Sequence, residues 1–323
     1  MKILITGGVG FIGSNFILNY LEKYPDIEIV NLDKLTYAAN TANLESIKNH
    51  KRYIFIKGDI CDRGLLQGLF DKHKFKGVIH FAAESHVDKS IKNPTEFINT
   101  NILGTFNLID IAKRFENSRF HHISTDEVYG SLGKEGLFTE QTAYAPNSPY
   151  SASKASSDFI VRSYFHTYGM PVITTNCSNN YGPNQHDEKL IPTIIRKALL
   201  GENIPIYGDG KNVRDWLYVE DHCSGIDLAF NHGVLGETYN IGGDNERNNL
   251  YIANAICNIL DEVLPKSKTY KEQIVFVTDR PGHDFRYAID ASKIEEQLGW
   301  KAQENFETGI RKTVDWYIKK YKS

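Results

Sequence analysis

The sequence lacks most features that mark specialised classes of protein. Its 323 residues include only four cysteines, widely spaced and with no CxxC pair, so neither a disulfide framework nor a structural zinc site is expected. No apolar run approaches the roughly 18 residues of a membrane-spanning helix. The N-terminus runs directly into the strand-like segment KILIT and shows no signal-peptide pattern. These absences predict a cytoplasmic protein with no membrane partner and no bound metal.

The sequence also has no excess of positive charge. Lys and Arg total 37 against 40 for Asp and Glu, which gives a net charge of −3, and no run of like charge is long. Because proteins that bind nucleic acid usually carry a basic excess, no nucleic-acid partner is expected. An anionic small molecule would have to be bound by a few local cations. The length suits one large domain or two closely joined domains.

The first half of the chain alternates short β-rich segments with longer helical patterns. The expected strands are Lys2–Thr6, Glu28–Leu32, Tyr53–Ile56, Gly77–Ala82 and Phe120–Ser124. The expected helices between them include Phe11–Lys23, Gly64–His73 and Pro94–Glu116. This alternation predicts the α/β class with a doubly wound parallel sheet, the Rossmann architecture. Ligands of such sheets bind beyond the carboxyl ends of the strands, so the residues that follow each strand are the first candidates for a site.

After Lys189 the alternation is less regular. Pro192, Pro205 and the turn-rich segment 207–212 interrupt it. The later expected elements are a helix and strand at Glu220–Asn231 and Glu237–Ile241, and helices at Leu250–Leu264, Ser292–Leu298 and Phe306–Tyr321. We therefore expect residues 1–181 to form the Rossmann domain, with residues 213–242 returning to it. Residues 182–212 and 243–323 are expected to form a smaller α/β domain for a substrate.

A glycine-rich turn, Thr6–Gly13, joins the first strand to the first helix. Gly7, Gly10 and Gly13 allow a tight turn, close approach of the backbone to a pyrophosphate, and close packing of helix on sheet. The helix N-terminus offers unpaired N–H groups to the phosphates. A purely structural turn is the alternative, but the strand before and the helix after favour a dinucleotide.

The residues after the second and third strands extend this prediction. Asp33 lies 20 residues after Gly13, where a carboxylate accepts hydrogen bonds from a ribose 2′-hydroxyl and repels a 2′-phosphate. This favours NAD over NADP, and Lys34 is the argument against it. Asp59 and Ile60 follow the third strand and are placed to flank the adenine, with a helix N-cap as the alternative role of Asp59.

A tyrosine and a lysine four residues apart, Tyr150 and Lys154, share one face of an expected helix. Free tyrosine has a pKa near ~10, so it is a poor base at neutral pH. A nearby ammonium group and the positive nicotinamide would favour the phenolate and make Tyr150 a usable base toward a sugar hydroxyl. Lys154 could also hold the nicotinamide ribose. The alternative is an exposed helical pair without a chemical role.

Several segments add a family resemblance to these motifs. They read DKLTYA at 33–38, AAESHVD at 82–88, STDEVYG at 124–130, NCSNNYGP at 176–183 and RPGH at 280–283. Together with the glycine turn and the Tyr150/Lys154 pair, they resemble the extended short-chain dehydrogenase/reductase family, and within it the dTDP-glucose 4,6-dehydratases. The resemblance covers nearly the whole chain. The departures at Val9, Lys89 and Phe285 touch none of the proposed chemical groups.

Two adjacent carboxyl groups, Asp126 and Glu127, follow the fifth expected strand and should lie near the nicotinamide. A simple dehydrogenase or epimerase needs only Tyr150 and a hydroxyl such as Thr125. Removal of water from a sugar also needs a base for the C5 proton and an acid for the C6 hydroxyl. Two carboxyl groups in different environments can divide these tasks. The alternative is a solvated acidic turn.

The resemblance implies a role for each catalytic residue. Tyr150 takes the proton of the 4-hydroxyl while C4 gives a hydride to NAD⁺, aided by a hydrogen bond from Thr125. Glu127 then removes the C5 proton and Asp126 protonates the leaving C6 oxygen, after which the hydride returns to C6. NAD would act as a bound reagent. Asp126 must be protonated when it acts, which requires a pKa raised by burial or by the neighbouring carboxylate.

The resemblance also implies the remaining contacts. Those expected toward NAD are Gly7, Gly10, Phe11, Ile12, Gly13, Asp33, Lys34, Leu35, Thr36, Asp59, Ile60, Phe81, Ala82, Ala83, Ser85, Thr100, Tyr150, Lys154 and Asn180. Those expected toward the nucleotide sugar are Ser85, Thr125, Asn179, Lys189, Leu190, Pro205, Tyr207, Arg214, Asn249, Arg280 and His283. The cations among the latter would meet the diphosphate. Each could instead be a surface or ion-pair residue, and His283 could be a packed histidine.

The two helical segments 94–116 and 150–168 have more apolar residues than one sheet-facing side requires. These are Ile102, Phe106, Ile109, Phe159 and Tyr164. The family resemblance implies a homodimer with a four-helix interface, and ordinary core positions are the alternative.

The function implied by the resemblance is NAD-mediated conversion of dTDP-glucose to dTDP-4-keto-6-deoxyglucose, as used for rhamnose-type surface polysaccharides. The alternatives are a dehydratase of UDP-, CDP- or GDP-sugars, a nucleotide-sugar 4-epimerase, and a non-catalytic NAD sensor. The paired carboxyl groups argue against the epimerase, and the intact set of Thr125, Tyr150 and Lys154 argues against the sensor.

Overall fold

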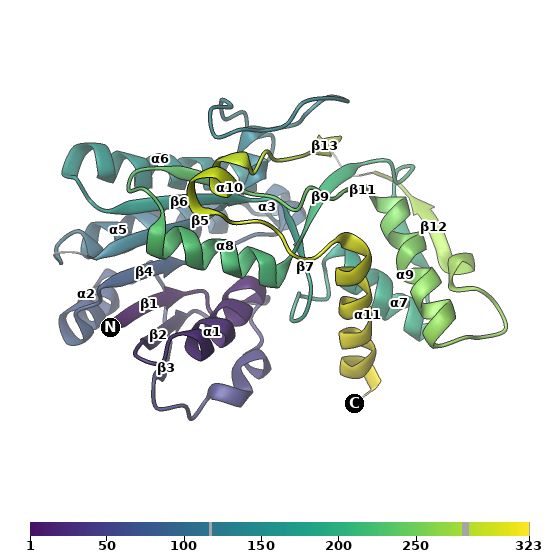
Figure 1. Ribbon diagram of the computed structural model, residues 1–323, viewed down its shortest axis with the longest axis horizontal. Helices are drawn as coiled ribbons and strands as arrows, with labels where there is room; N and C mark the ends of the chain where they lie inside the picture. The colour runs from purple at the N-terminus through teal and green to yellow at the C-terminus, as the bar shows by residue number, and fades with distance from the viewer. Residues whose placement is uncertain (116–117, 280–283, 323) are drawn as a thin grey trace.

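The computed structural model describes residues 1–115, 118–279 and 284–322, which form two layered regions (Figure 1). The larger region is built on a parallel sheet with the strand order β10-β6-β5-β4-β1-β2-β3. Its strands are β1 (Lys2–Thr6), β2 (Glu28–Asp33), β3 (Tyr53–Lys57), β4 (Gly77–His80), β5 (Arg119–Thr125), β6 (Val172–Cys177) and β10 (Thr238–Ile241). From β1 the sheet extends in both directions, so its winding reverses between β1 and β4. A ligand crevice is expected at the carboxyl ends of the strands there.

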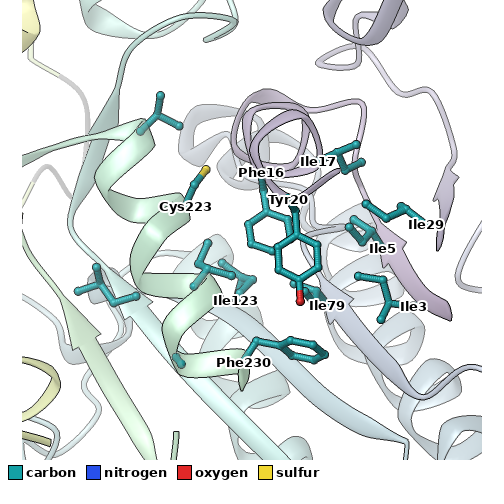
Figure 2. Close-up of a cluster of buried hydrophobic side chains, with 14 of the residues drawn as sticks. Ile3, Ile5, Phe16, Ile17, Tyr20, Ile29, Ile79, Ile123, Cys223 and Phe230 are labelled. Carbon is teal, nitrogen blue, oxygen red and sulfur yellow. The ribbon is translucent and has the colours of Figure 1, made fainter. Parts of the chain in front are cut away.

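Alternate side chains of the central strands pack into two separate cores. Ile3 and Ile5 of β1 lie in one cluster with Phe16 and Phe230 (Figure 2), while Leu4 lies in a cluster on the opposite face. The helices of the first layer are α1 (Phe11–Lys23), α8 (Val219–His232) and α10 (Ser292–Leu298). Those of the second layer are α2 (Arg63–His73), α5 (Thr105–Ala112) and α6 (Pro149–Tyr168). Helices on both faces make this the doubly wound sheet that the alternation predicts.

The smaller region has its own core between short strands and three helices. One sheet has the order β11-β9-β13, with β7 also paired to β9, and β8 pairs with β12. These strands are β7 (Asn179–Tyr181), β8 (Ile204–Tyr207), β9 (Val213–Tyr218), β11 (Glu246–Asn248), β12 (Ile274–Val277) and β13 (Arg286–Tyr287). The helices are α7 (Leu190–Leu200), α9 (Asn249–Val263) and α11 (Phe306–Lys322).

The chain crosses between the two regions more often than we expected from the sequence. Residues 219–241 return to the large sheet as α8 and β10, but β7 and β9 belong to the small sheet. Helix α10 packs against α8 and β10, so it belongs to the layers of the large sheet. The division into two domains at these boundaries stays a prediction.

Two prolines that interrupt the sequence pattern lie inside regular elements. Pro192 is in the first turn of α7, where a backbone N–H would have no intrahelical partner. Pro205 lies in β8, which pairs only with β12 among the described strands. The other edge of β8 has no partner strand there, and proline is tolerated on such an edge because it has no N–H to donate. These prolines interrupt the sequence pattern without interrupting the helix or the strand, because proline is tolerated at helix starts and sheet edges.

The segment expected as one helix from Pro94 is divided into three. Helix α4 (Pro94–Phe97) is followed by a π-helical segment, Ile98–Gly104, and then by α5; Glu116 lies outside the described residues. Asn101 in the wide turn accepts the N–H of Glu84 at 2.8 Å and donates to Ser153 Oγ at 2.8 Å. π-turns of this kind often occur at functional sites.

The five residues expected at a dimer interface differ in exposure, and Ile102 is half-buried. Ile109 and Tyr164 are buried in the core of the large region, so these two are ordinary core positions, the alternative to an interface. Phe106 and Phe159 are 37% and 58% exposed. Within the described part of the chain, no helix has both the length and the apolar composition to cross a membrane.

Candidate active site

A cavity of about 310 Å³ opens at the carboxyl ends of β1, β2, β4, β5 and β6. Gly7, Asp33, Phe81, Thr125 and Ser178 each line it from the end of one of these strands. The cavity therefore lies where the winding of the sheet reverses.

The glycine turn forms a close backbone cradle at one end of the cavity. Gly7 has a φ of +72°, and a Cβ added to it would lie 2.5 Å from the backbone nitrogen of Ala82. A Cβ on Gly13 would lie 2.6 Å from the carbonyl oxygen of Gly7. Helix α1 starts at Phe11, and its N-cap, Gly10, has no side chain to cap the first-turn N–H groups. This arrangement fits a pyrophosphate at a helix N-terminus.

Replacing Gly7 by alanine is expected to abolish NAD binding. The added methyl group meets backbone atoms of Phe81 and Ala82, and the left-handed conformation is strained for alanine. Isothermal titration of the purified variant should detect no NAD affinity. Gly68→Ala is the matched control, because a Cβ at Gly68 meets nothing within 4 Å. Unchanged NAD affinity of Gly7→Ala would show that the turn does not hold the cofactor.

Asp33 faces the cavity from the end of β2 and is held by backbone donors. Its Oδ2 accepts the N–H of Val9 at 2.9 Å and its Oδ1 accepts the N–H of Leu35 at 2.8 Å. Burial raises the pKa of Asp33, and the two backbone hydrogen bonds lower it. Fixed carboxylate oxygens of this kind suit a ribose diol. Leu35 itself is not among the lining residues, so its expected contact with NAD is not placed at the cavity.

Lys34 and Asp59 form an ion pair across the two strand ends, with Lys34 Nζ 2.9 Å from Asp59 Oδ2. Lys34, whose positive charge was the argument for NADP, is thus paired with Asp59. The N-cap of α2 is Asp62, which accepts the N–H of Leu65 at 2.9 Å. The alternative role of Asp59 as a helix cap is therefore wrong. Apart from Leu35, every residue expected to contact NAD lines the cavity.

The five expected catalytic residues lie together on the wall of the same cavity. Thr125 ends β5, and Asp126 and Glu127 begin the 3-10 turn Asp126–Tyr129. The Thr125 hydroxyl lies 3.3 Å from Asp126 Oδ1 and accepts the N–H of Glu127 at 3.3 Å. Tyr150 and Lys154 come from α6, whose start is fixed by a capping box at Ser148.

Asp126 is buried and its environment favours the protonated acid. Burial is the main cause that raises its pKa well above the ordinary value, and the charges of Glu127 and Asp215 raise it further. Among the described residues, no group hydrogen-bonds its Oδ2. Glu127, by contrast, is half-buried. The two carboxyl groups thus have different environments, as the division into an acid and a base requires.

Burial is the largest influence on the pKa of Tyr150 in the structure, and the expected effect of Lys154 together with the nicotinamide stays a prediction. Burial raises the pKa of Tyr150 well above the ordinary value, the charge of Glu127 raises it further, and the hydroxyl of Thr125 lowers it. The ammonium of Lys154 donates to the carbonyl oxygen of Ile123 at 2.8 Å. Burial is thus the largest influence on the pKa of the phenol, and the ammonium of Lys154 is held against β5.

The residues expected to bind the nucleotide sugar are only partly gathered at this cavity. Ser85, Thr125, Asn179 and Lys189 line it, and Lys189 Nζ donates to the carbonyl oxygen of Ser85 at 3.2 Å. Leu190, Pro205, Tyr207, Arg214 and Asn249 belong to the smaller region and are not among the lining residues. Arg280 and His283 lie outside the described residues.

Arg214 is buried beneath the smaller sheet. Its guanidinium donates to the carbonyl oxygens of Val213 at 2.7 Å and Asp284 at 3.0 Å, and it lies 4.3 Å from the ring centre of Tyr287. Its charge also lowers the pKa of Asp126, against the larger effect of burial.

Several lining residues were missed by the sequence analysis. They are Leu32, Ala38, Ala39, Gly58, Glu84, Ile123, Ser124, Cys177, Ser178, Gln185, His186 and Glu188. Ser124, Cys177 and Ser178 lie at the carboxyl ends of strands, so the rule for parallel sheets could have found them. Gln185, His186 and Glu188 come from the loop after β7, whose return over the cavity has no local sequence signal.

Comparison with known proteins identifies the family of the chain. Residues 4–313 match the family model described as GDP-mannose 4,6 dehydratase. The dTDP-glucose 4,6-dehydratase of Salmonella typhimurium is 54% identical over 336 residues, which cover 98% of this chain and 93% of that protein. The chain belongs to the dTDP-glucose 4,6-dehydratase family. This dehydratase is therefore an enzyme of the hydro-lyase class.

Solved structures of relatives agree with the fold of this dehydratase. The dTDP-glucose 4,6-dehydratase of Bacillus anthracis, solved in complex with NAD, is 48% identical with a TM-score of 0.91 over 100% of this chain and 98% of its own. That of Streptomyces venezuelae, also solved with NAD bound, is 45% identical with a TM-score of 0.93 over 99% of this chain and 97% of its own. The predicted α/β Rossmann class is confirmed.

Proposed function

We propose that the protein converts dTDP-glucose to dTDP-4-keto-6-deoxyglucose, with NAD as its resident cofactor. The observation that supports this most is the pair of carboxyl groups, Asp126 and Glu127, beside Tyr150 in the cavity at the strand ends. Relatives that are about half identical over nearly the full chain are named dTDP-glucose 4,6-dehydratases. An enzyme that only oxidised or epimerised the sugar at C4 would not need this pair.

The described residues fit NAD. The crowded backbone at Gly7 and Gly13 leaves no room for side chains, as a pyrophosphate cradle requires. Asp33 presents a fixed carboxylate for the adenine ribose, and Tyr150 and Lys154 line the same cavity. When bound, NAD supplies a reversible hydride acceptor for the sugar.

Tyr150 and Thr125 act at the 4-hydroxyl of the sugar. Tyr150 takes its proton, and Thr125 donates a hydrogen bond to the same oxygen. In the structure burial holds the Tyr150 phenol protonated, so a positive charge must lower its pKa before it acts as a base. The ammonium of Lys154 and the nicotinamide cation are the two charges available to do so.

Asp126 and Glu127 eliminate water across C5 and C6. Once C4 is a ketone, the C5 proton is acidic, and the carboxylate of Glu127 removes it. Asp126, kept protonated by burial and by the charge of Glu127, protonates the C6 oxygen as it leaves. Lys189, which lines the cavity, would bind the diphosphate of the substrate.

Parallel incubations with dTDP-glucose and UDP-glucose, without added reductant, test the proposed function. Mass spectrometry should show that the dTDP sugar loses one water and that the UDP sugar does not. A product of unchanged mass from dTDP-glucose, or water loss from UDP-glucose alone, would overturn the proposed reaction or the proposed nucleotide.

We also propose a homodimer formed through exposed apolar residues of the α4–α5 segment and α6. Ile98, Leu103, Phe106, Phe159 and Tyr168 are 53%, 46%, 37%, 58% and 56% exposed. Exposed apolar residues gathered on neighbouring helices are typical of protein interfaces.

The solution mass by light scattering is expected to be twice the 36.7 kDa of one chain. Leu103→Asp should shift it to one chain, and Leu200→Asp on α7 is the matched control, at 62% exposed. A wild-type monomer at micromolar concentration would reject the dimer.

A further inference from the structure

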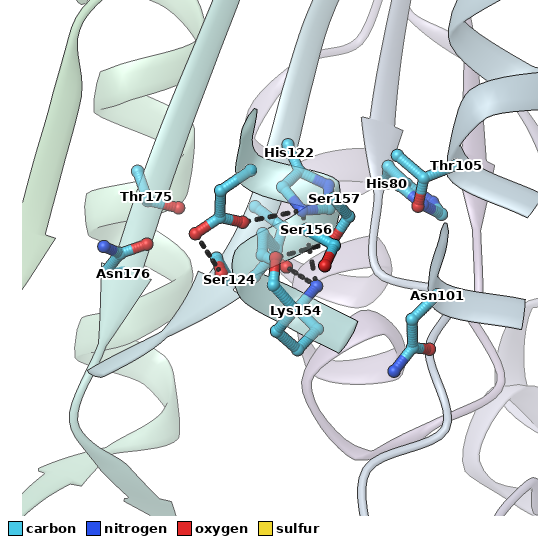
Figure 3. A network of polar contacts seen from close by, with 12 residues as sticks. His80, Asn101, Thr105, His122, Ser124, Lys154, Ser156, Ser157, Thr175 and Asn176 are labelled. Atoms are coloured by element: carbon cyan, nitrogen blue, oxygen red, sulfur yellow. Dashed lines mark hydrogen bonds and ion pairs between the residues drawn. The ribbon is translucent and has the colours of Figure 1, made fainter. Parts of the chain in front are cut away.

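Three ionisable side chains, His122, Lys154 and Asp158, form a buried cluster at the catalytic site, and Figure 3 labels the first two. His122 from β5 is 0% exposed, and Lys154 and Asp158 from α6 are each 4% exposed. Only Lys154 has a role in the reaction proposed above. His122 and Asp158 are not among the residues that line the cavity. Unused buried charge is costly, so the cluster calls for an explanation.

The imidazole of His122 lies against both Asp158 and Lys154. His122 Nε2 lies 3.1 Å from Asp158 Oδ1 and 3.4 Å from Lys154 Nζ. The other carboxylate oxygen, Asp158 Oδ2, accepts the hydroxyls of Ser124 at 2.9 Å and Tyr144 at 3.0 Å. Ser124 is also a lining residue next to Thr125. The carboxylate is thus fixed on one side by hydroxyl donors, and its other oxygen lies beside His122, which also contacts the lysine.

The ionisable groups around the cluster are neutral near pH 7, so they do not balance the lysine charge. Burial lowers the pKa of His80 and His122 far below the ordinary value. Burial raises the pKa of the Cys177 thiol, which faces Lys154 from β6. Tyr129, Tyr144 and Tyr150 also have pKa values raised by burial.

Asp158 has the larger effect of the two acids that raise the pKa of Lys154, the other being Cys177. Burial lowers the pKa of Lys154 to about 8 and raises that of Asp158 to about 6. Between these pH values both groups are mainly charged. Removing the carboxylate would leave the ammonium buried and uncompensated, and its pKa would fall further.

We propose that Asp158 is a positioning residue of the reaction: its negative charge keeps Lys154 a charged ammonium ion in the wall of the active site. The inference rests on the proposed function for the role of that charge, which is to favour the Tyr150 phenolate and to hold the NAD ribose. The spacing of four residues between Lys154 and Asp158 places both on one face of α6. Asp158 acts through Lys154 and need not touch the substrate.

The pH profile of kcat/KM tests this role in the holoenzyme. Because the ammonium is lost as pH rises through the pKa of Lys154, wild-type kcat/KM should fall above about pH 8. Asp158→Asn should move this alkaline limb down by about one pH unit or more, a tenfold loss of kcat/KM at high pH. Tyr144→Phe removes one hydrogen-bond donor to Asp158 Oδ2, which raises the pKa of Asp158 and disfavours its charged form. It should move the alkaline limb in the same direction by less.

Asp110→Asn is the matched control for the loss of a carboxylate. Asp110 on α5 pairs with Arg63 at 2.5 Å and accepts the hydroxyl of Tyr164 at 3.2 Å, so it contacts α6 away from Lys154. It should leave the alkaline limb in place. A limb that moves equally in Asp110→Asn and Asp158→Asn, or in neither, would overturn the proposal.

A second measurement does not depend on turnover. In holoprotein labelled with carbon-13 at lysine Cε, the Lys154 signal is identified by its absence from Lys154→Arg and followed by NMR as pH is raised. Its midpoint should fall in Asp158→Asn and, by less, in Tyr144→Phe, so the test survives if Asp158→Asn does not fold. Unchanged midpoints would overturn the role of Asp158. Failure of the wild type to act on dTDP-glucose would instead overturn the proposed function, and the titration would still decide the charge of Lys154.

Discussion

Glutamine in place of Glu127 is expected to stop the loss of water from the sugar while still allowing slow oxidation at C4. An amide cannot take the C5 proton, and loss of a positioned base costs about 10²–10⁴-fold in rate. The backbone N–H of Glu127, which donates to Thr125, is unchanged, so the turn should keep its shape. Mass spectrometry should find 4-keto sugar that has kept its C6 oxygen.

Asp126→Asn tests the role of Asp126 as the acid separately from the role of Glu127 as the base. The amide is neutral like the buried acid that it replaces, so the unfolding midpoint should not fall. Glu127 can then still exchange the C5 proton with solvent, but the C6 oxygen leaves without a proton donor. In deuterated water we expect deuterium at C5 without loss of water. Wild-type turnover in either variant would remove that residue from its role.

Phenylalanine in place of Tyr150 is expected to slow the oxidation at C4 itself by about 10²–10⁴-fold, because the 4-hydroxyl loses its base. The ring keeps its edge contact with Phe97, whose centre lies 6.3 Å away, so the unfolding midpoint should be unchanged. Tyr164→Phe on the same helix is the control, since its hydroxyl donates to Asp110 and Tyr164 is not among the cavity-lining residues. Rapid-quench analysis of the C4-oxidised sugar measures the step, and an unaltered rate would exclude Tyr150 as the base.

The parts of the fold that depend on local pattern could be predicted. The first strand and first helix begin and end as expected, at Lys2–Thr6 and Phe11–Lys23. Buried parallel strands read as continuous apolar runs, and a helix that covers them reads with its own period. The π-helical segment Ile98–Gly104 could not be predicted, because it depends on Asn101 meeting Glu84 and Ser153 from other elements.

The candidate site follows the same division. Residues that directly follow strands, such as Asp33 and Asp126, were found because the topology of a parallel sheet gathers strand ends. His122 and Asp158 were missed because His122 lies inside β5 and its neighbours in space come from α6. The burial of Tyr150 and Lys154 could not be predicted for a related reason: the sequence shows that the two residues are four positions apart but not what surrounds them.

The central claim is that the enzyme removes a proton from C5 and a hydroxyl from C6 of the same sugar. Wild-type holoenzyme and dTDP-glucose in deuterated water test it in one incubation, followed by mass spectrometry and NMR of the product. The account predicts a sugar that has lost one water and carries one deuterium at C5. A product that keeps its C6 hydroxyl and has no deuterium at C5 would contradict it.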